Sequence, residues 1–203
     1  HVKDRCNRAI ERRLGHLDQA ETRLANATVL TDDHAATLAV IIDDTQAGLT
    51  TLQADIAAAT EPEVVRELCG RIAPDYRVYL VVLPQAHLTV GADRVDVATD
   101  RAEEAIEKFD EALAAAEAAG ADITEATALR DEAAAHVDTA EDAAEGMADS
   151  VLAVTPESYN NGSGAADLDA ARSALRTSRE ELKQAHASAK AAVEALREAI
   201  DDI

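Results

Sequence analysis

The sequence is poor in aromatic residues. Phe and Tyr make up 2 % of its 203 residues, tryptophan is absent, and there is a single methionine. Large aromatic side chains dominate the cores of broad globular folds, so a core of that kind is disfavoured. The hydrophobic fraction is nevertheless 47 %, with alanine as its largest part. Alanine is the best helix former and buries little area, which favours closely packed helices and predicts an all-α protein.

Long hydrophobic runs are absent as well. The longest uninterrupted apolar run, from Val78 to Leu83, is far shorter than the roughly 20 apolar residues that a membrane-spanning helix needs. The sequence therefore predicts no membrane span. The chain begins at His1 rather than methionine, as expected of a mature protein whose signal peptide has been removed, or of a tag remnant.

Basic residues are scarce, and the net charge is −21. From His1 to Leu83 there are nine Lys and Arg against thirteen Asp and Glu; from Pro84 to Ile203 there are ten against twenty-seven. Such a surface repels phosphate backbones and anionic lipids, which disfavours nucleic acid and membrane surfaces as partners. Cations or a basic protein partner suit it better. The same acid can also serve only to solvate the helices.

Motifs that would carry chemistry are missing. There is no serine in a glycine elbow and no glycine loop that could cradle a phosphate. None of the histidines inside the chain follows an acid by three residues, the spacing of di-iron bundles. Glu132 and His136 share a helix face, but such pairs are usually solvated. We therefore expect no catalytic residue, no metal ligand and no cofactor, and a protein that is not an enzyme.

Apolar residues at spacings of three and four predict three helices in the first part of the chain. The first runs from Val2 to about Ala27. Thr31 has the chemistry of an N-cap for the second. Thr60 and Glu63 have the capping-box spacing around Pro62, which predicts a third helix starting near Glu61. The apolar rows of these helices are Ile10, Leu14, Leu17 and Leu24; Leu38, Ile42, Leu49, Leu52 and Ile56; and Val64, Val65, Leu68, Cys69 and Ile72.

The two cysteines fall near the same level of this three-helix arrangement. Cys6 lies about four residues into the first helix and Cys69 about eight residues into the third, so their heights are roughly 6 and 12 Å at about 1.5 Å per residue. Helix tilt could absorb that difference, and we predict a Cys6–Cys69 disulfide. Structural disulfides persist in oxidising compartments, so the pair points outside the cytoplasm. Two separate buried thiols in a cytosolic protein are the alternative.

The segment from Arg71 to Val90 is ambiguous. Residues 76–83 are rich in β-branched and aromatic side chains, and with Pro84 as a turn they could form a hairpin with residues 88–90. A lone hairpin is marginally stable, however, and no other segment supplies more strands. We therefore favour a helix with bends near Gly70, Pro74 and Pro84.

The acidic second part predicts three more helices. The first keeps a regular seam from Val95 and ends at Gly120, and Thr124 is expected to cap the next one. That helix continues to Val151, weakened slightly by Gly146. Residues 154–164 have the composition of a loop. The last helix begins near Ala165 and runs to Ile203 with the most sustained three-four alternation in the chain.

These elements predict an elongated all-α fold of two end-to-end antiparallel three-helix bundles of coiled-coil type. The expected division places an N-terminal bundle with the disulfide at residues 1–83 and an acidic bundle at residues 84–203, joined through a bent long helix.

Several local features together carry a resemblance. They are a cysteine near the N-terminus, the run Leu30–His34, Cys69, the segment Asp75–Tyr79, and then Pro84 and His87. In these features the first hundred or so residues resemble a set of uncharacterised secreted or surface helical proteins of high-GC Gram-positive bacteria. The resemblance implies export and a helical architecture, and no mechanism. The alanine-rich, Asp-rich second half, with more arginine than lysine, would also suit the cytoplasm of a halophile.

Two functions from different classes follow. The leading one is a non-catalytic structural or protein-interaction protein that is secreted or held at the cell surface, with a protein partner or self-association. The alternative is a helical module that binds a small molecule or acts as a sensor, with a pocket at residues 71–90. Tyr76, Arg77, Tyr79 and His87 form a candidate interaction patch, because tyrosine and arginine are common interface anchors; packing of the tyrosine rings at the helix junction is the other interpretation.

Overall fold

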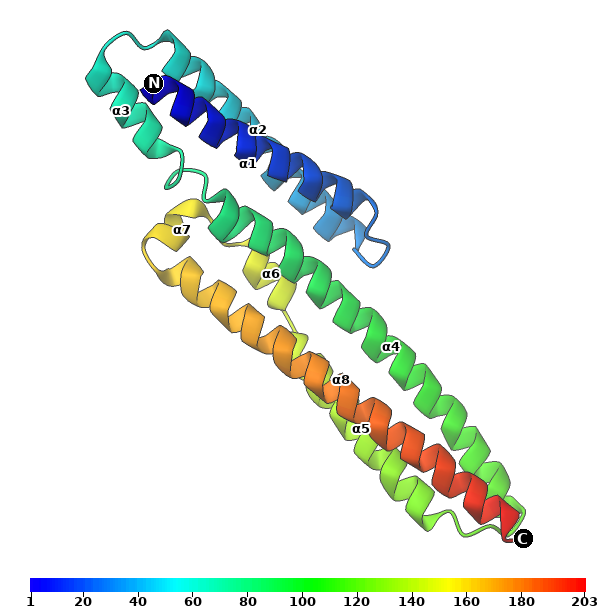
Figure 1. Cartoon of the computed structure of the whole chain (residues 1–203). Coiled ribbons are helices and arrows are strands. Elements are labelled where there is room, and N and C mark those ends of the chain that lie inside the picture. Colours follow the sequence, from blue (N-terminus) through cyan, green and yellow to red (C-terminus); the bar gives the residue numbers. More distant parts are fainter. The chain divides into compact units, whose positions relative to one another are not determined.

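The chain is predominantly helical in the computed structural model, which describes residues 1–203 (Figure 1). No strand is present, so the all-α prediction is confirmed. None of the helices combines the length and hydropathy that crossing a bilayer requires. The elements are α1 (Val2–Ala25), α2 (Asp32–Ala58), α3 (Pro62–Arg71), the π-helix η1 (Val78–Val82), α4 (Leu83–Ala118), α5 (Thr124–Ala144), α6 (Met147–Leu152), α7 (Pro156–Asn160) and α8 (Ser163–Asp201).

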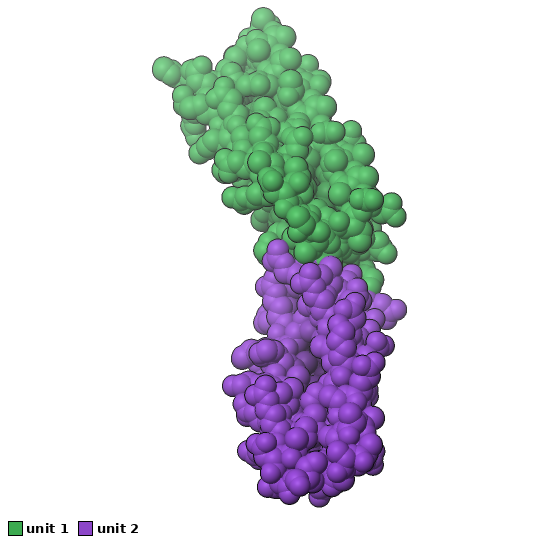
Figure 2. All heavy atoms as spheres, turned by 90° about the vertical axis from the view of Figure 1, so that its right-hand side faces the viewer, with its two compact units in different colours: residues 1–93, 146–172 green, residues 94–145, 173–203 purple.

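The chain packs as two compact units, coloured separately in Figure 2. Unit 1 comprises His1–Asp93 and Gly146–Arg172, and unit 2 comprises Arg94–Glu145 and Ser173–Ile203. This division differs from the expected one at residues 83 and 84. Residues 146–172 pack with the N-terminal part of the chain, and both α4 and α8 contribute residues to each unit. Sequence order alone places residues 146–172 in the second bundle.

Of two helix starts in unit 1, that of α2 has the predicted side-chain cap and that of α3 does not. The Thr31 hydroxyl accepts a hydrogen bond from the His34 N–H and caps α2, as predicted. At α3 the N-cap residue is Glu61, with Pro62 in the first turn and no side-chain hydrogen bond at the cap. The capping box expected between Thr60 and Glu63 is therefore not formed. Pro62 favours this helix start, because its fixed φ suits the first turn.

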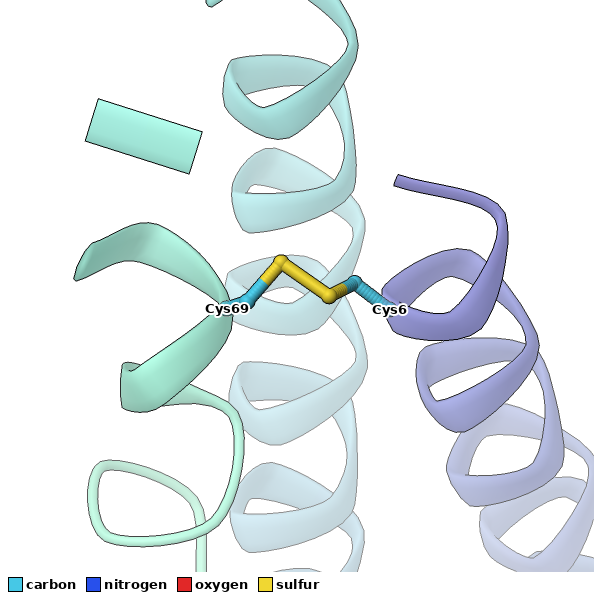
Figure 3. The surroundings of a disulfide bond; sticks show 2 residues. All are labelled: Cys6 and Cys69. Carbon is cyan, nitrogen blue, oxygen red and sulfur yellow. A yellow bond between two sulfur atoms is a disulfide. The ribbon is translucent and has the colours of Figure 1, made fainter. Parts of the chain in front are cut away.

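The core of unit 1 is built from the apolar rows of α1 and α2, closed by residues after α3. Its fully buried members include Ile10, Leu17, Ile42, Leu49 and Ile56. Cys6 and Cys69 lie at the edge of this core, and Figure 3 shows their side chains meeting between α1 and α3. Their sulfur atoms are 2.08 Å apart and their Cα atoms 5.7 Å apart, which is disulfide distance.

Residues 78–90 of the ambiguous segment are helical, so the hairpin alternative is wrong, whereas residues 72–77 form a turn in place of the expected bent helix. After α3 a turn leads to Arg77, which adopts φ 41°, in the left-handed region. The next residues form the π-helix η1, in which the Leu83 N–H donates to the Val78 carbonyl one residue further back than in an α-helix. Pro84 follows at the second position of α4. Because proline has no N–H to donate, residue 84 could not form the α-helical hydrogen bond to the Leu80 carbonyl. The π-helical turn thus lies where the α-helical hydrogen bonds would have been interrupted.

Two expectations for the segment around residues 145–164 are corrected. Gly146 ends the helix instead of merely weakening it, because it takes φ 63°, and α6 begins at the next residue. The predicted loop 154–164 contains a short helix, α7, whose N-cap Thr155 exchanges hydrogen bonds with Ser158. A serine in place of the usual Glu or Gln completes this capping box, and the pattern was therefore missed.

Unit 2 consists of residues 94–118 of α4, all of α5, and residues 173–201 of α8. In Figure 1, α4 and α8 run in the same direction and α5 runs opposite to both. Gly120 takes φ 97°, as expected for the residue after a helix. Thr124 does not cap α5 but is its first residue, and its N–H and hydroxyl both donate to the Asp122 carboxylate. These hydrogen bonds lower the pKa of Asp122 below its ordinary value.

Candidate functional site

An apolar cavity of about 410 Å³ lies among the three helices of unit 2. It extends along α4 from Ala98 to Phe109, along α8 from Leu182 to Val193, and along α5 from Arg130 to Val137. Its volume falls within the range of about 300 to 1,000 Å³ that small-molecule sites occupy. Its lining residues are Ala98, Arg101, Ala102, Ala105, Ile106, Phe109, Arg130, Ala133, Val137, Leu182, Ala185, His186, Ala189, Ala192 and Val193.

The cavity follows from where the chain places small and large side chains. Seven of its lining residues are alanines, distributed over all three helices. Beyond the Phe109 end, Leu113 and Leu196 pack together with Ala116, Ala121 and Ala126 and close the space between the helices. Space remains where the facing residues of the three helices are alanine, because an alanine side chain is only a methyl group. The empty volume is thus a consequence of sequence.

Of the three basic residues at the cavity, Arg130 is paired with carboxylates, and Arg101 and His186 are not. Arg130 donates hydrogen bonds to both carboxylate oxygens of Asp110 and, over 2.8 Å, to Asp131. The hydrogen bond to Asp110 raises the pKa of this guanidinium above its ordinary value. Arg101 and His186 are exposed and form neither a hydrogen bond nor an ion pair.

The predicted patch of Tyr76, Arg77, Tyr79 and His87 is not brought together on one surface. Tyr76 is half-buried and packs on the core of unit 1, with its ring against Gly48 of α2. Burial raises the pKa of its phenol above the ordinary value of 10.0. His87 is exposed on α4 and has no hydrogen-bond partner.

The other two members of that patch contact different helices. The Arg77 guanidinium donates to Asn160 Oδ1 over 2.6 Å and lies 5.5 Å from the centre of the Tyr159 ring, so it ties the turn after α3 to α7. The Tyr79 hydroxyl lies 3.1 Å from Nδ1 of His16 on α1, and the Arg13 guanidinium lies 5.1 Å from the Tyr79 ring centre. These contacts belong to the packing of unit 1.

Two of the histidines considered for metal binding, His34 and His136, form carboxylate pairs instead. His136 Nδ1 lies 2.6 Å from Glu181 on α8, whereas its Nε2 lies 4.0 Å from Glu132, the partner that sequence spacing indicated. His34 Nδ1 lies 2.7 Å from the carboxylate of Asp93, which is 1 % exposed and also accepts the Thr31 N–H. No group of three or more His, Cys, Asp or Glu is placed to hold a metal ion.

The sequence does not indicate the cavity, because alanines at seam positions predict close helix packing. The signal that would indicate the cavity is that alanines from three different helices lie around the same space. Ala102 and Ala105 on α4 face Ala133 on α5 and Ala189 on α8 around one void. Single-helix periodicity reports which face is inside, but it does not report that three small faces meet at one level.

The fold and this cavity define an all-α protein with a ligand-sized apolar space in one of its units. Comparisons with protein-family models, with curated proteins and with solved structures gave no match.

Proposed function

We propose that the protein is a non-catalytic extracytoplasmic binding protein whose unit 2 holds an apolar small molecule. The observation that carries this function is the cavity of about 410 Å³ with a predominantly aliphatic lining. Concave, mostly apolar spaces with a few polar groups are the usual form of small-molecule sites. The sequence had suggested a pocket at residues 71–90; the cavity that supports ligand binding lies instead along residues 98–109, 130–137 and 182–193.

The extracytoplasmic location rests on the cysteine pair. Cys6 and Cys69 lie at disulfide distance, and no cysteine is left free. Structural disulfides persist outside the reducing cytoplasm. The pair is thus compatible with a secreted or surface-held protein.

The test uses an uncharged fluorescent probe, N-phenyl-1-naphthylamine, whose emission rises in apolar surroundings. We expect saturable binding with one site per chain. Ala189→Leu adds three carbon atoms to the lining of the cavity and should abolish the signal while the melting temperature stays equal or rises, because filling a void restores packing. Ala187→Leu is the matched control, since Ala187 is exposed on the same helix and does not line the cavity. Equal probe binding by both variants would rule out the cavity as the site.

A second candidate function is protein interaction through α1. Arg5, Arg8 and Arg12 follow one another at helical spacing, are largely exposed, and form no ion pair. In a chain of net charge −21 such a basic face is an exception, and it suits an acidic partner. Charge reversal of the three arginines followed by sedimentation of the protein at low and high salt would show whether this face drives association.

A further inference from the structure

The cavity of unit 2 has a charge pattern opposite to that of its surroundings. Residues 94–145 and 173–203 contain nine Lys and Arg against twenty-two Asp and Glu, a net charge of −13. None of these acids lines the cavity, whereas Arg101, Arg130 and His186 do. The pattern points to an apolar occupant with an anionic group.

Only two of the three basic groups are available to such an occupant. Arg130 is engaged by Asp110 and Asp131 and carries no unpaired charge. Arg101 and His186 have no partner. Lys183 and Lys190 lie three residues before and four after His186, on the same side of α8, but each is already paired, with Glu180 and Glu194. Arg101 is therefore the strongest candidate contact for an anion.

Arg101 and His186 lie near the same end of the cavity. Arg101 follows the first lining residue of α4, Ala98, by three positions, and His186 follows the first lining residue of α8, Leu182, by four. Because α4 and α8 run in the same direction (Figure 1), and Leu113 of α4 lies in one core cluster with Leu196 of α8, these positions are at similar levels. From Arg101 the lining continues for eight residues to Phe109, which is about 12 Å at about 1.5 Å per residue.

We infer that the occupant is a free single-chain carboxylic acid of about ten carbons, with its carboxylate at Arg101 and His186 and its chain directed toward Phe109. An extended polypeptide covers about 3.5 Å per residue over three bonds, so an all-trans carbon chain of about ten bonds spans about 12 Å. A guanidinium donates well to a carboxylate and gives charge-assisted hydrogen bonds. This inference rests on the proposed function, since it names the ligand class of the same cavity.

The acidic surface of unit 2 does not prevent such binding at physiological salt. At about 0.15 M ionic strength the Debye length is about 8 Å, so exposed carboxylates further away than this are largely screened. A carboxylate in contact with Arg101 is within hydrogen-bond range and is screened much less. Binding should therefore weaken at low salt, where the repulsion of the twenty-two acids extends further.

The test is isothermal titration calorimetry of the intact protein with decanoate and with decan-1-ol at 0.15 M salt. The two ligands have the same chain and differ in the charge of the head group. We expect the wild type to bind decanoate at least about tenfold more tightly than decan-1-ol. Arg101→Gln should weaken decanoate about tenfold and change decan-1-ol less than about twofold, because only the charged contact is removed. His186→Gln should have a smaller effect in the same direction.

Arg197→Gln is the matched control, because Arg197 is exposed on α8, changes the net charge equally and does not line the cavity. It should leave both affinities unchanged. Equal binding of decanoate and decan-1-ol, or an unchanged preference in Arg101→Gln, would overturn the inference and leave the apolar cavity as a binding site. Binding of neither ligand by the wild type would overturn this inference, and would overturn the proposed function only if N-phenyl-1-naphthylamine also fails to bind.

Discussion

The side-chain amide of Gln85 lies 2.8 Å from the carbonyl oxygen of Val154, although 69 residues separate the two in sequence. The same Nε2 is 2.9 Å from the Val151 carbonyl oxygen and 3.3 Å from that of Leu152. The carbonyls at the end of a helix have no partner within it. Gln85, which is 1 % exposed, thus supplies donors to the end of α6 from the first turns of α4.

Replacing Gln85 with leucine should therefore lower the free energy of unfolding by about 1–3 kcal/mol, because the carbonyls of Leu152 and Val154 would lose their donor, whereas that of Val151 keeps the Val154 N–H. Urea unfolding followed by circular dichroism measures this change. Gln184→Leu is the control: Gln184 is exposed and bonds only Glu180, so its loss should stay within about 0.5 kcal/mol. Equal losses in the two variants would show that the Gln85 contacts contribute nothing.

The helix ends show which parts of the fold could be predicted. Thr31 and Gly120 mark helix ends through interactions within a few residues, and both were predicted. The end of α6 depends on Gln85, and the placement of α7 depends on Arg77 and Asn160, whose partners are distant in sequence. No local pattern reports such contacts, so the segment 146–172 was assigned to the wrong neighbours.

Gly48 offers a second test, because it lies against Tyr76. A Cβ atom at Gly48 would lie 2.5 Å from Cε1 of that ring. Alanine normally stabilises a helix interior by about 1 kcal/mol relative to glycine. At position 48 the clash should reverse the sign, and we expect Gly48→Ala to destabilise by about 1–3 kcal/mol. Thermal melting measures the difference.

Gly15 provides the matched control. It also lies inside a helix, α1, and nothing lies within 4 Å of a Cβ added there. Gly15→Ala should therefore stabilise by about 1 kcal/mol. In the Gly48→Ala background, Tyr76→Leu should cost less than it does alone, because the two changes share one contact. A rise in melting temperature for both glycine variants would show that Tyr76 does not pack on α2.

Tyr76 also predicts the response to alkaline pH. Burial raises the pKa of its phenol above 10.0, so the folded protein favours the neutral form more than the unfolded chain does. Its contribution to stability is complete below the unfolded pKa and is lost as the pH rises through the folded pKa. Tyr76→Phe should therefore lose less stability than the wild type between about pH 9 and 12. Urea unfolding across that range tests this, and parallel curves for the two proteins would contradict it.

The candidate site was harder to predict than the cysteine pair, and the reason is physical. Cys6 and Cys69 could be matched because chain order and helix rise place both at similar levels. The cavity depends on the absence of volume at seven alanines from three helices, and a missing side chain leaves no distinctive pattern. The sequence also does not single out Arg101, because it lies in a segment rich in acidic residues.

The cysteine pair gives the last prediction. A bond between Cys6 and Cys69 closes a loop with a sequence separation of 63, and the chain-entropy model values a loop of that size at about 4 kcal/mol. Cys6→Ser with Cys69→Ser should lower the free energy of unfolding by about that amount. Reductant should bring the wild type to the same value and leave the double variant unchanged. Because both sulfurs are held in the bond, unfolding the wild type without reductant should expose no reactive thiol. Two titratable thiols per denatured chain would show that the sulfurs are not bonded, and would remove the main support for an extracytoplasmic location.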